Sequence, residues 1–150
     1  MEERRILFDE IRIFARTIAR RVEDKENITH VIGLARGGLI PATIMSYALD
    51  KPLLSYGINS YKGSKKTENF HINQSINLNE LKDKNNNLHV LVVDDICDTG
   101  DTMKHVTKQL ALGNIPYTTA CICTKEKFTH WLDHYGTVVP DNRWIVFPWE

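Results

Sequence analysis

The feature that most constrains the fold of this chain is an apolar run that ends in adjacent carboxylates. Residues 90–93 read Val-Leu-Val-Val, and Asp94 and Asp95 follow them directly. A short, mostly β-branched run of this kind is typical of a strand buried on both faces of a parallel sheet. Residues 103–112 carry apolar side chains at helical spacing. Residues 99–102 are therefore expected to form the turn between a strand and a helix.

This turn has the composition of a phosphate site with acids beside it. It reads Thr-Gly-Asp-Thr, and a turn that opens a helix presents free backbone N–H groups, which bind phosphate. Asp94, Asp95 and Asp98 add carboxylates that suit sugar hydroxyls, a divalent cation or acid–base work. Together these groups indicate a phosphorylated ribose as ligand. The alternative is an acidic helix cap, which explains one aspartate better than three.

Strands and helices alternate along the chain. Apolar spacing predicts helices at 7–22, 39–49 and 103–112, a helical turn or short helix at 128–135, and strands at 28–34, 52–60, 90–93, 117–124 and 138–139. The polar residues 61–73 are interpreted as a mobile loop, 76–81 as a short return strand or turn, and 82–87 as a turn. We therefore expect an α/β fold, one domain over residues 1–150, with a mostly parallel central sheet flanked by helices.

Three segments should meet where the parallel strands end, namely 35–38, 94–102 and 124–127. The first contains Arg36-Gly37-Gly38, where glycines allow close backbone approach to a ligand and an arginine matches phosphate. A tight turn with a solvated arginine explains the same residues, and their spacing alone favours neither reading.

The bulk properties exclude several classes of function. Nineteen basic and nineteen acidic residues give zero formal net charge, which argues against a general binder of nucleic acids or membrane surfaces. No apolar stretch is long enough to cross a bilayer, so we expect no integral membrane association. Three cysteines without a secretion signal favour reduced thiols and a cytoplasmic location.

Residues 28–150 resemble a known family, most strongly at 33–41, 92–102 and 139–149. Val-Val-Asp-Asp-Ile-Cys-Asp-Thr-Gly-Asp-Thr at 92–102 resembles the phosphoribosyl-pyrophosphate signature of the type I phosphoribosyltransferases. The run Val-Pro-Asp-Asn-Arg-Trp-Ile-Val-Phe-Pro-Trp-Glu at 139–150 is similar to the C-terminal hood of the xanthine-guanine phosphoribosyltransferases. The resemblance implies the type I phosphoribosyltransferase fold, a flexible catalytic loop at about 60–75 and a small hood at about 138–150.

The resemblance also implies an activity. It is the transfer of a 5-phosphoribosyl group from phosphoribosyl pyrophosphate to N9 of guanine, xanthine or hypoxanthine, with release of pyrophosphate, in purine salvage. The implied cofactor is Mg²⁺ and the implied assembly is a homo-oligomer, either a dimer or a tetramer. Two alternatives stay open: a regulator that binds phosphoribosyl pyrophosphate without catalysis, and a phosphoribosyltransferase with a non-purine acceptor.

Roles at the phosphoribosyl pyrophosphate site follow from the same resemblance. Asp94 and Asp95 would hold the ribose hydroxyls, and one of them would also hold the metal directly or through water. Asp98 would lie near N7 of the purine as general base or charged partner. The 5-phosphate would be bound by the backbone of four residues, Thr99, Gly100, Asp101 and Thr102.

Further roles come from the turns and the tail. Arg36 and Gly37 would hold pyrophosphate, with a cis peptide between Ala35 and Arg36, and Ser60 and Tyr61 would open the catalytic loop. For the base, Lys125 would read the 6-oxo group, with Lys127 as a near alternative. Trp144 would stack on the purine, and the backbone of Ile145 would read the 2-position.

Overall fold

The computed structural model describes the backbone of residues 2–62, 66–74 and 77–150, and the side chains of these residues except Lys25 and those within 58–74. In chain order the elements are β1 (Glu2–Arg5), α1 (Phe8–Lys25), β2 (His30–Ala35), α2 (Leu39–Leu49), β3 (Leu53–Lys62), β4 (Lys66–Gln74), α3 (Leu78–Lys84), β5 (Val90–Cys97), α4 (Asp101–Leu112), β6 (Tyr117–Thr124), a short 3₁₀ helix η1 (Glu126–Phe128), β7 (His134–Val138) and β8 (Arg143–Val146).

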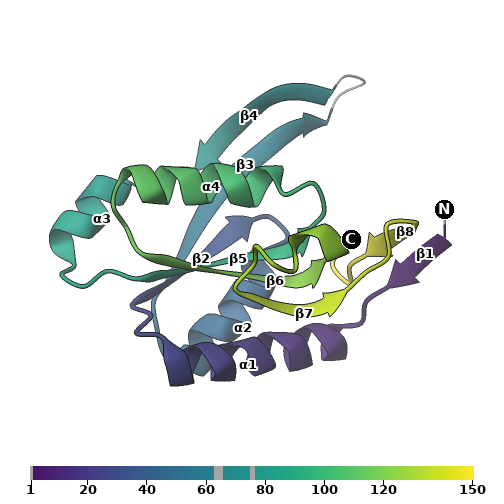
Figure 1. The fold of residues 1–150 in the computed structure, drawn as a ribbon, viewed down its shortest axis with the longest axis horizontal. Coiled ribbons are helices and arrows are strands. Elements are labelled where there is room, and N and C mark those ends of the chain that lie inside the picture. Colours follow the sequence, from purple (N-terminus) through teal and green to yellow (C-terminus); the bar gives the residue numbers. More distant parts are fainter. Residues whose placement is uncertain (1, 63–65, 75–76) are drawn as a thin grey trace.

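A six-stranded sheet forms the centre of the molecule, with strand order β4-β3-β2-β5-β6-β7. Five of its strands are parallel and only the edge strand β4 runs antiparallel. Helices α1 and α2 lie on one side of the sheet and α3 and α4 on the other (Figure 1). The expected α/β fold with a mostly parallel sheet is confirmed.

The buried strand β5 supplies side chains to the cores on both faces of this sheet. Leu91 and Val93 belong to the core under α1 and α2, whereas Val90 and Val92 belong to the core under α4. All four side chains are fully buried. A strand enclosed on both faces has no solvent side, which explains why residues 90–93 are apolar without alternation.

The segment after β3 differs from the expected loop. Strand β3 continues to Lys62, and β4 returns antiparallel beside it, so that the two strands form an arm projecting from the body of the molecule (Figure 1). Polar composition suggested a loop at 61–73, but antiparallel pairing satisfies backbone N–H and C=O groups whatever the side chains are. The loop prediction is therefore wrong for the two paired stretches.

A short helix replaces the return strand or turn expected at 76–81 and part of the turn at 82–87. Helix α3 begins after Asn77, whose side-chain oxygen accepts a hydrogen bond from the Glu80 N–H at 3.0 Å. Glu80 also pairs with Lys84 one turn later, at 2.7 Å. Asn followed three residues later by Glu is a helix-start pattern, and here it outweighed the scarcity of apolar residues.

The region after β6 was only partly predicted. The helical turn expected at 128–135 is limited to η1 and the turn that follows it, and strand β7 already begins at His134. Asp133 explains the early strand, because its carboxylate accepts hydrogen bonds from the N–H and hydroxyl of Thr119 on β6, at 2.8 and 3.1 Å. This side-chain link draws the chain onto the β6 edge just before β7.

The first and last strands form a second, two-stranded sheet that the sequence did not indicate. β1 and β8 pair in parallel, with Glu2 opposite Arg143 and Arg5 opposite Val146. Both lie at one end of the molecule, beyond the central sheet (Figure 1). Residues 143–146 were expected only as part of an aromatic tail.

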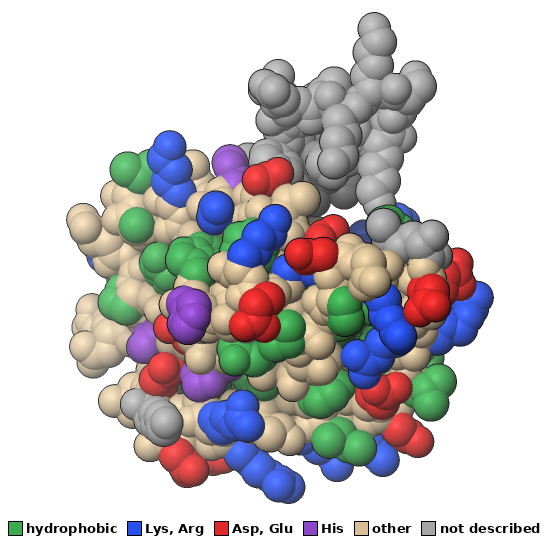
Figure 2. Space-filling view, turned by 45° about the vertical axis from the view of Figure 1, so that its right-hand side comes forward, with side chains coloured by type: hydrophobic (Ala, Val, Ile, Leu, Met, Phe, Trp, Pro, Cys, Tyr) green, Lys and Arg blue, Asp and Glu red, His purple; other side chains and the backbone are tan. Residues whose placement is uncertain are grey.

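The charges of the chain are dispersed on the face that Figure 2 shows. Lysine and arginine side chains alternate there with aspartate and glutamate and do not gather into one basic stripe. None of the described helices combines the length and apolar character that a membrane crossing needs.

Candidate active site

Three neighbouring strands bring the predicted segments together at their carboxyl ends. β2 pairs with β5 through Gly33 and Val93, and β5 pairs with β6 through Cys97 and Thr124. The N–H of Lys125 donates a hydrogen bond to the Cys97 carbonyl oxygen at 3.0 Å, which continues the contact past the sheet. The expected convergence of 35–38, 94–102 and 124–127 is thus present in the fold.

The turn after β2 lies against the end of β5. A Cβ atom added to Gly37 would overlap the Asp95 carboxylate, and one added to Gly38 would lie 2.5 Å from the Val93 carbonyl oxygen. Both glycines are therefore required by close approach, as the sequence suggested. The peptide bond between Ala35 and Arg36 is cis, as the resemblance implied, and the Arg36 side chain is exposed.

Two half-buried carboxylates lie at the end of β5. An oxygen of Asp94 accepts the Asp95 N–H at 2.8 Å, and an oxygen of Asp95 accepts the Ile96 N–H at 2.7 Å. Burial, and then the neighbouring Asp95, raise the pKa of Asp94 well above its ordinary value, and burial also raises the pKa of Asp95. The pair therefore carries less negative charge than two free carboxylates unless a cation or hydroxyl donors stabilise it.

These two carboxylates suit a magnesium ion. Oxygen ligands are what a hard cation prefers, and Mg²⁺ is commonly held by one or two carboxylates together with water and substrate phosphates. Among the described residues no cluster of three acidic, histidine or cysteine side chains is placed to hold a metal by itself. Asp94 and Asp95 thus fit a cation that is shared with a phosphorylated substrate.

We expect Asp94→Asn to stabilise the fold at neutral pH. An acid whose pKa is higher when folded binds protons more readily in the folded state, so its contribution to stability falls as pH rises above about 4. Asparagine has no charge to bury and can still accept the Asp95 N–H.

Thermal unfolding without divalent cations, at several pH values, tests this expectation. The variant should have the higher Tm at pH 7.5. The difference in Tm should shrink toward pH 4, where Asp94 of the wild type takes up a proton and becomes uncharged, like asparagine. The phosphoribosyl transfer that the sequence resemblance implies should be slower in the same variant. A lower Tm at pH 7.5 would contradict the burial argument.

The loop between β5 and α4 has the geometry of an anion site. Gly100 caps α4 with φ of 80°, and as a glycine it offers no side chain of its own to the first turn of this helix. The side chains of Asp98, Thr99 and Asp101 are exposed, and the Asp101 N–H lies 3.3 Å from the Thr99 hydroxyl oxygen. Uncapped N–H groups at a helix N-terminus favour a phosphate group.

Phe128 and Lys104 are two neighbours of this loop that the sequence did not single out. A Cβ added to Gly100 would lie 2.7 Å from the Phe128 ring, so the ring limits the loop on one side. The ammonium groups of Lys104 and Lys127 lie 5.5 and 5.2 Å from the centre of the same ring. Only the position of Lys104, in the first turn after the phosphate-type loop, could have drawn attention to it.

Lys125 is held by the chain itself. Its side chain is only 5 % exposed, and its ammonium group donates to the carbonyl oxygens of Pro140 at 2.8 Å and Arg143 at 3.4 Å. The side chain therefore connects the end of β6 to the segment that leads into β8. Its role in reading a base stays a prediction, whereas its hydrogen bonds to this segment are direct. Lys127, the near alternative, is exposed.

We expect Lys125→Met to loosen this segment. Methionine keeps most of the apolar stem but leaves the Pro140 carbonyl oxygen without its donor, at a cost of about 1–3 kcal/mol. Hydrogen exchange at 141–146 should accelerate and the Tm should fall. Lys127→Met is the matched control, and its side chain is exposed, so it should change neither quantity appreciably. Equal behaviour of the two variants would argue against the link.

The remaining predicted residues are divided between exposed and buried positions. Trp144 is 56 % exposed on β8, whereas the next residue, Ile145, is 6 % exposed and packs in the core under α1. An outward ring and an inward anchor are the ordinary alternation of a strand. The side chains of Ser60 and Tyr61 lie outside the described residues.

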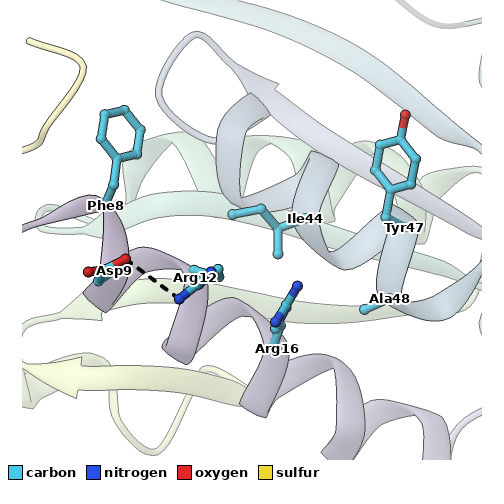
Figure 3. Close-up of a pocket in the computed structure, with 7 residues that line it drawn as sticks. All are labelled: Phe8, Asp9, Arg12, Arg16, Ile44, Tyr47 and Ala48. Carbon is cyan, nitrogen blue, oxygen red and sulfur yellow. Dashed lines mark ion pairs between the residues drawn. The ribbon is translucent and has the colours of Figure 1, made fainter.

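A large cavity lies away from this site. It has a volume of about 510 Å³ and lies between α1 and α2, with Arg12, Arg16, Ile44 and Tyr47 in its lining (Figure 3). Arg12 is paired there with Asp9 on the same helix, at 3.6 Å. The cavity contains none of the predicted site residues, so the site is identified by its chemistry and not by concavity.

Comparisons with known proteins agree with this geometry. Residues 4–150 match the phosphoribosyl transferase domain. The chain is 26 % identical over 146 residues to the xanthine-guanine phosphoribosyltransferase of Idiomarina loihiensis, covering 97 % of this chain and 85 % of the relative. It is 28 % identical to the enzyme of the same name from Gluconobacter oxydans, covering 97 % and 83 %.

Solved structures give the same picture. The purine phosphoribosyltransferase of Pyrococcus horikoshii Ot3 superimposes with a TM-score of 0.83 and 29 % identity, over all of this chain and 95 % of that one. The xanthine-guanine-hypoxanthine phosphoribosyltransferase of Helicobacter pylori superimposes with a TM-score of 0.80 over 99 % and 94 % of the two chains. At 19 % identity the second likeness supports the fold alone.

Proposed function

The chain belongs to the phosphoribosyltransferase family, and from this premise we propose that it transfers a 5-phosphoribosyl group from phosphoribosyl pyrophosphate to N9 of a 6-oxopurine. The names of its relatives support a purine acceptor. One observation carries the proposal: a short loop joins the end of β5, which carries the half-buried pair Asp94 and Asp95, to the N-terminus of α4, whose N-cap Gly100 has no side chain. An anion site joined to hydroxyl- and metal-binding carboxylates matches a phosphorylated ribose.

Each part of the donor substrate has a proposed site. The 5-phosphate binds to the backbone N–H groups of 99–102, and the ribose hydroxyls bind to Asp94 and Asp95. Arg36 and Gly37 bind the pyrophosphate group from the turn after β2, which lies against Asp95. Asp94 and Asp95 would hold Mg²⁺, which would neutralise charge on the pyrophosphate leaving group.

The chemical step exchanges one bond at C1 of the ribose for another. The bond from C1 to pyrophosphate breaks, the bond from C1 to N9 of the purine forms, and the purine loses a proton from N7. Asp98 accepts this proton or stabilises it as a charged partner, which makes N9 the better nucleophile. The Asp98 side chain is exposed on the loop after β5, which leaves room for the purine above the ribose.

The base is held between the end of β6 and the residues of β8. Trp144 offers an exposed ring for stacking, the backbone of Ile145 reads the 2-position, and Lys125 favours a 6-oxo group because an ammonium only donates hydrogen bonds. Ser60 and Tyr61 belong to the segment proposed to close over pyrophosphate and exclude water. A homo-oligomeric state, a cytoplasmic location and a role in purine salvage stay predictions from the sequence.

A spectrophotometric assay tests the proposed function. Phosphoribosyl pyrophosphate and Mg²⁺ are offered with guanine, xanthine, hypoxanthine, adenine, uracil and orotate in parallel, and a chelator serves as the control for the metal. Turnover of one or more 6-oxopurines, lost on chelation, is the expected result. Binding of phosphoribosyl pyrophosphate without turnover of any base would indicate a regulator, and turnover of a pyrimidine alone would overturn the roles of Lys125 and Trp144.

A further inference from the structure

The base-binding strand β8 depends on the first residues of the chain. In the part of the chain that the structure describes, β8 forms a sheet with β1 alone and has no partner in the central sheet. The register places Glu3 opposite Trp144 and Arg4 opposite Ile145. The residues proposed to stack on and read the purine are therefore paired with the N-terminal strand.

Backbone hydrogen bonds continue this pairing into α1. The Ile6 N–H donates to the Val146 carbonyl oxygen at 3.0 Å, and the next N–H, of Leu7, donates to the Glu10 carboxylate in the first turn of α1 at 3.2 Å. Arg4 also pairs with Glu10, at 3.6 Å. Since α1 packs on the central sheet, it gives β1, and through it β8, a fixed position.

Buried side chains anchor the same region. Ile6, Ile145 and Phe147 are all almost fully buried and belong to the core under α1. Phe147 stacks on Trp149 with ring centres 5.0 Å apart, and Trp149 in turn lies 6.4 Å from Phe8, the first residue of α1. This apolar packing should keep β1 and β8 folded against α1 even when one backbone hydrogen bond between the two strands is lost.

Trp144 has little such packing. Its side chain is 56 % exposed, so the direction of its ring follows from the backbone of β8. That backbone is supported from one side by β1 and from the other by the Lys125 ammonium, which bonds the carbonyl oxygens of Pro140 and Arg143. We propose that β1 is a positioning element for the purine, fixing Trp144 and Ile145 without touching the base.

This inference rests on the proposed function, and it predicts a selective effect. The segments proposed to bind phosphoribosyl pyrophosphate follow β2 and β5, and β1 pairs with neither strand. Weakening β1 should therefore lower affinity for the purine and leave affinity for phosphoribosyl pyrophosphate unchanged. A general loss of stability would affect both substrates together.

Proline substitutions in β1 provide a matched pair. The Ile6 N–H faces β8, and because N–H directions alternate along a strand, the Arg4 N–H also faces β8 and the Arg5 N–H faces the open edge. Arg4→Pro removes a donor to β8, whereas Arg5→Pro makes the same chemical change at a position that tolerates proline. Arg4→Ala removes the ion pair to Glu10 but keeps the N–H.

We expect Arg4→Pro to raise the KM for the purine at least about fivefold, as the loss of a hydrogen bond would. The KM for phosphoribosyl pyrophosphate should stay within about twofold, and both constants should stay within about twofold in Arg5→Pro and Arg4→Ala. Hydrogen exchange at 143–146 should accelerate in Arg4→Pro alone.

The exchange measurement needs no activity and separates the two ideas. If the wild type turns over no 6-oxopurine, the proposed function fails. Faster hydrogen exchange at 143–146 that is confined to Arg4→Pro would still show that β1 holds β8 in place. Equal exchange in the two proline variants, or an equal rise of KM for both substrates in Arg4→Pro, would overturn the inference.

Discussion

Asp98→Asn should lower kcat by roughly 10²- to 10⁴-fold, the contribution typical of a positioned general base. Asparagine has nearly the shape of aspartate but cannot accept the N7 proton. The side chain of Asp98 is exposed on the loop between β5 and α4, so the substitution fits without repacking. Steady-state kinetics with the preferred 6-oxopurine give kcat, and calorimetry gives the affinity for phosphoribosyl pyrophosphate separately.

A matched control makes this result specific. Asp50→Asn is the same change at an exposed residue that ends α2, where φ is 53° and asparagine is well tolerated. It should leave kcat within about twofold of the wild type. Binding of phosphoribosyl pyrophosphate should persist in Asp98→Asn. Wild-type kcat in Asp98→Asn would remove this carboxylate from the chemical step and leave the identity of the base open.

Gly38→Ala should destabilise the fold by about 3 kcal/mol, which lowers the Tm of a protein of this size by about 6–12 °C. The added Cβ would lie 2.5 Å from the Val93 carbonyl oxygen and 2.7 Å from that of Leu34. Both atoms belong to the backbone of central strands and cannot move aside as a side chain can. With φ at −71°, Gly38 is not strained, so the contact alone produces the cost.

Gly113→Ala tests the argument from contact. Gly113 ends α4 with φ of −85°, and an added Cβ would meet its nearest neighbour, Ile115, at an ordinary 3.5 Å. Its Tm should stay close to that of the wild type, because alanine restricts the unfolded chain without a clash in the folded one. Thermal unfolding of both variants provides the test, and equal Tm values would show that the turn at Gly38 can move away from β2 and β5 at little cost.

Hydrophobic pattern carried most of the fold prediction. Helix α2 and strand β6 have the bounds that their sequences indicated, because α2 is mostly apolar, β6 is rich in β-branched residues, and each is bounded by Gly, Pro or charged residues. The pattern could not reveal β4 or α3, which few apolar residues mark and which local hydrogen bonds define. It could not reveal β1 either, since Glu-Glu-Arg-Arg gains its strand only from a partner at the other end of the chain.

The parts of the site that lie in one stretch of sequence could be predicted, whereas contacts between distant segments could not. The carboxylates and the phosphate-type turn lie in one stretch of sequence, so their proximity follows from a single strand end. The cis peptide before Arg36 came from resemblance alone and is confirmed. The bond from Lys125 to the Pro140 carbonyl oxygen, and the position of Phe128 against Gly100, depend on how separate segments pack, which no local pattern encodes.

The pairing of β1 with β8 also has a consequence for folding. It joins residues about 140 positions apart, so it closes one of the longest loops that this chain can form. Contacts of such long range form late, after the locally connected β2-α2-β3 and β5-α4-β6 units have assembled. By the same reasoning the two ends of the chain should open together, below the free energy of global unfolding, as one cooperative unit. Such a partly open molecule would retain the segments proposed to bind phosphate and lose the ordered segment proposed to bind the base.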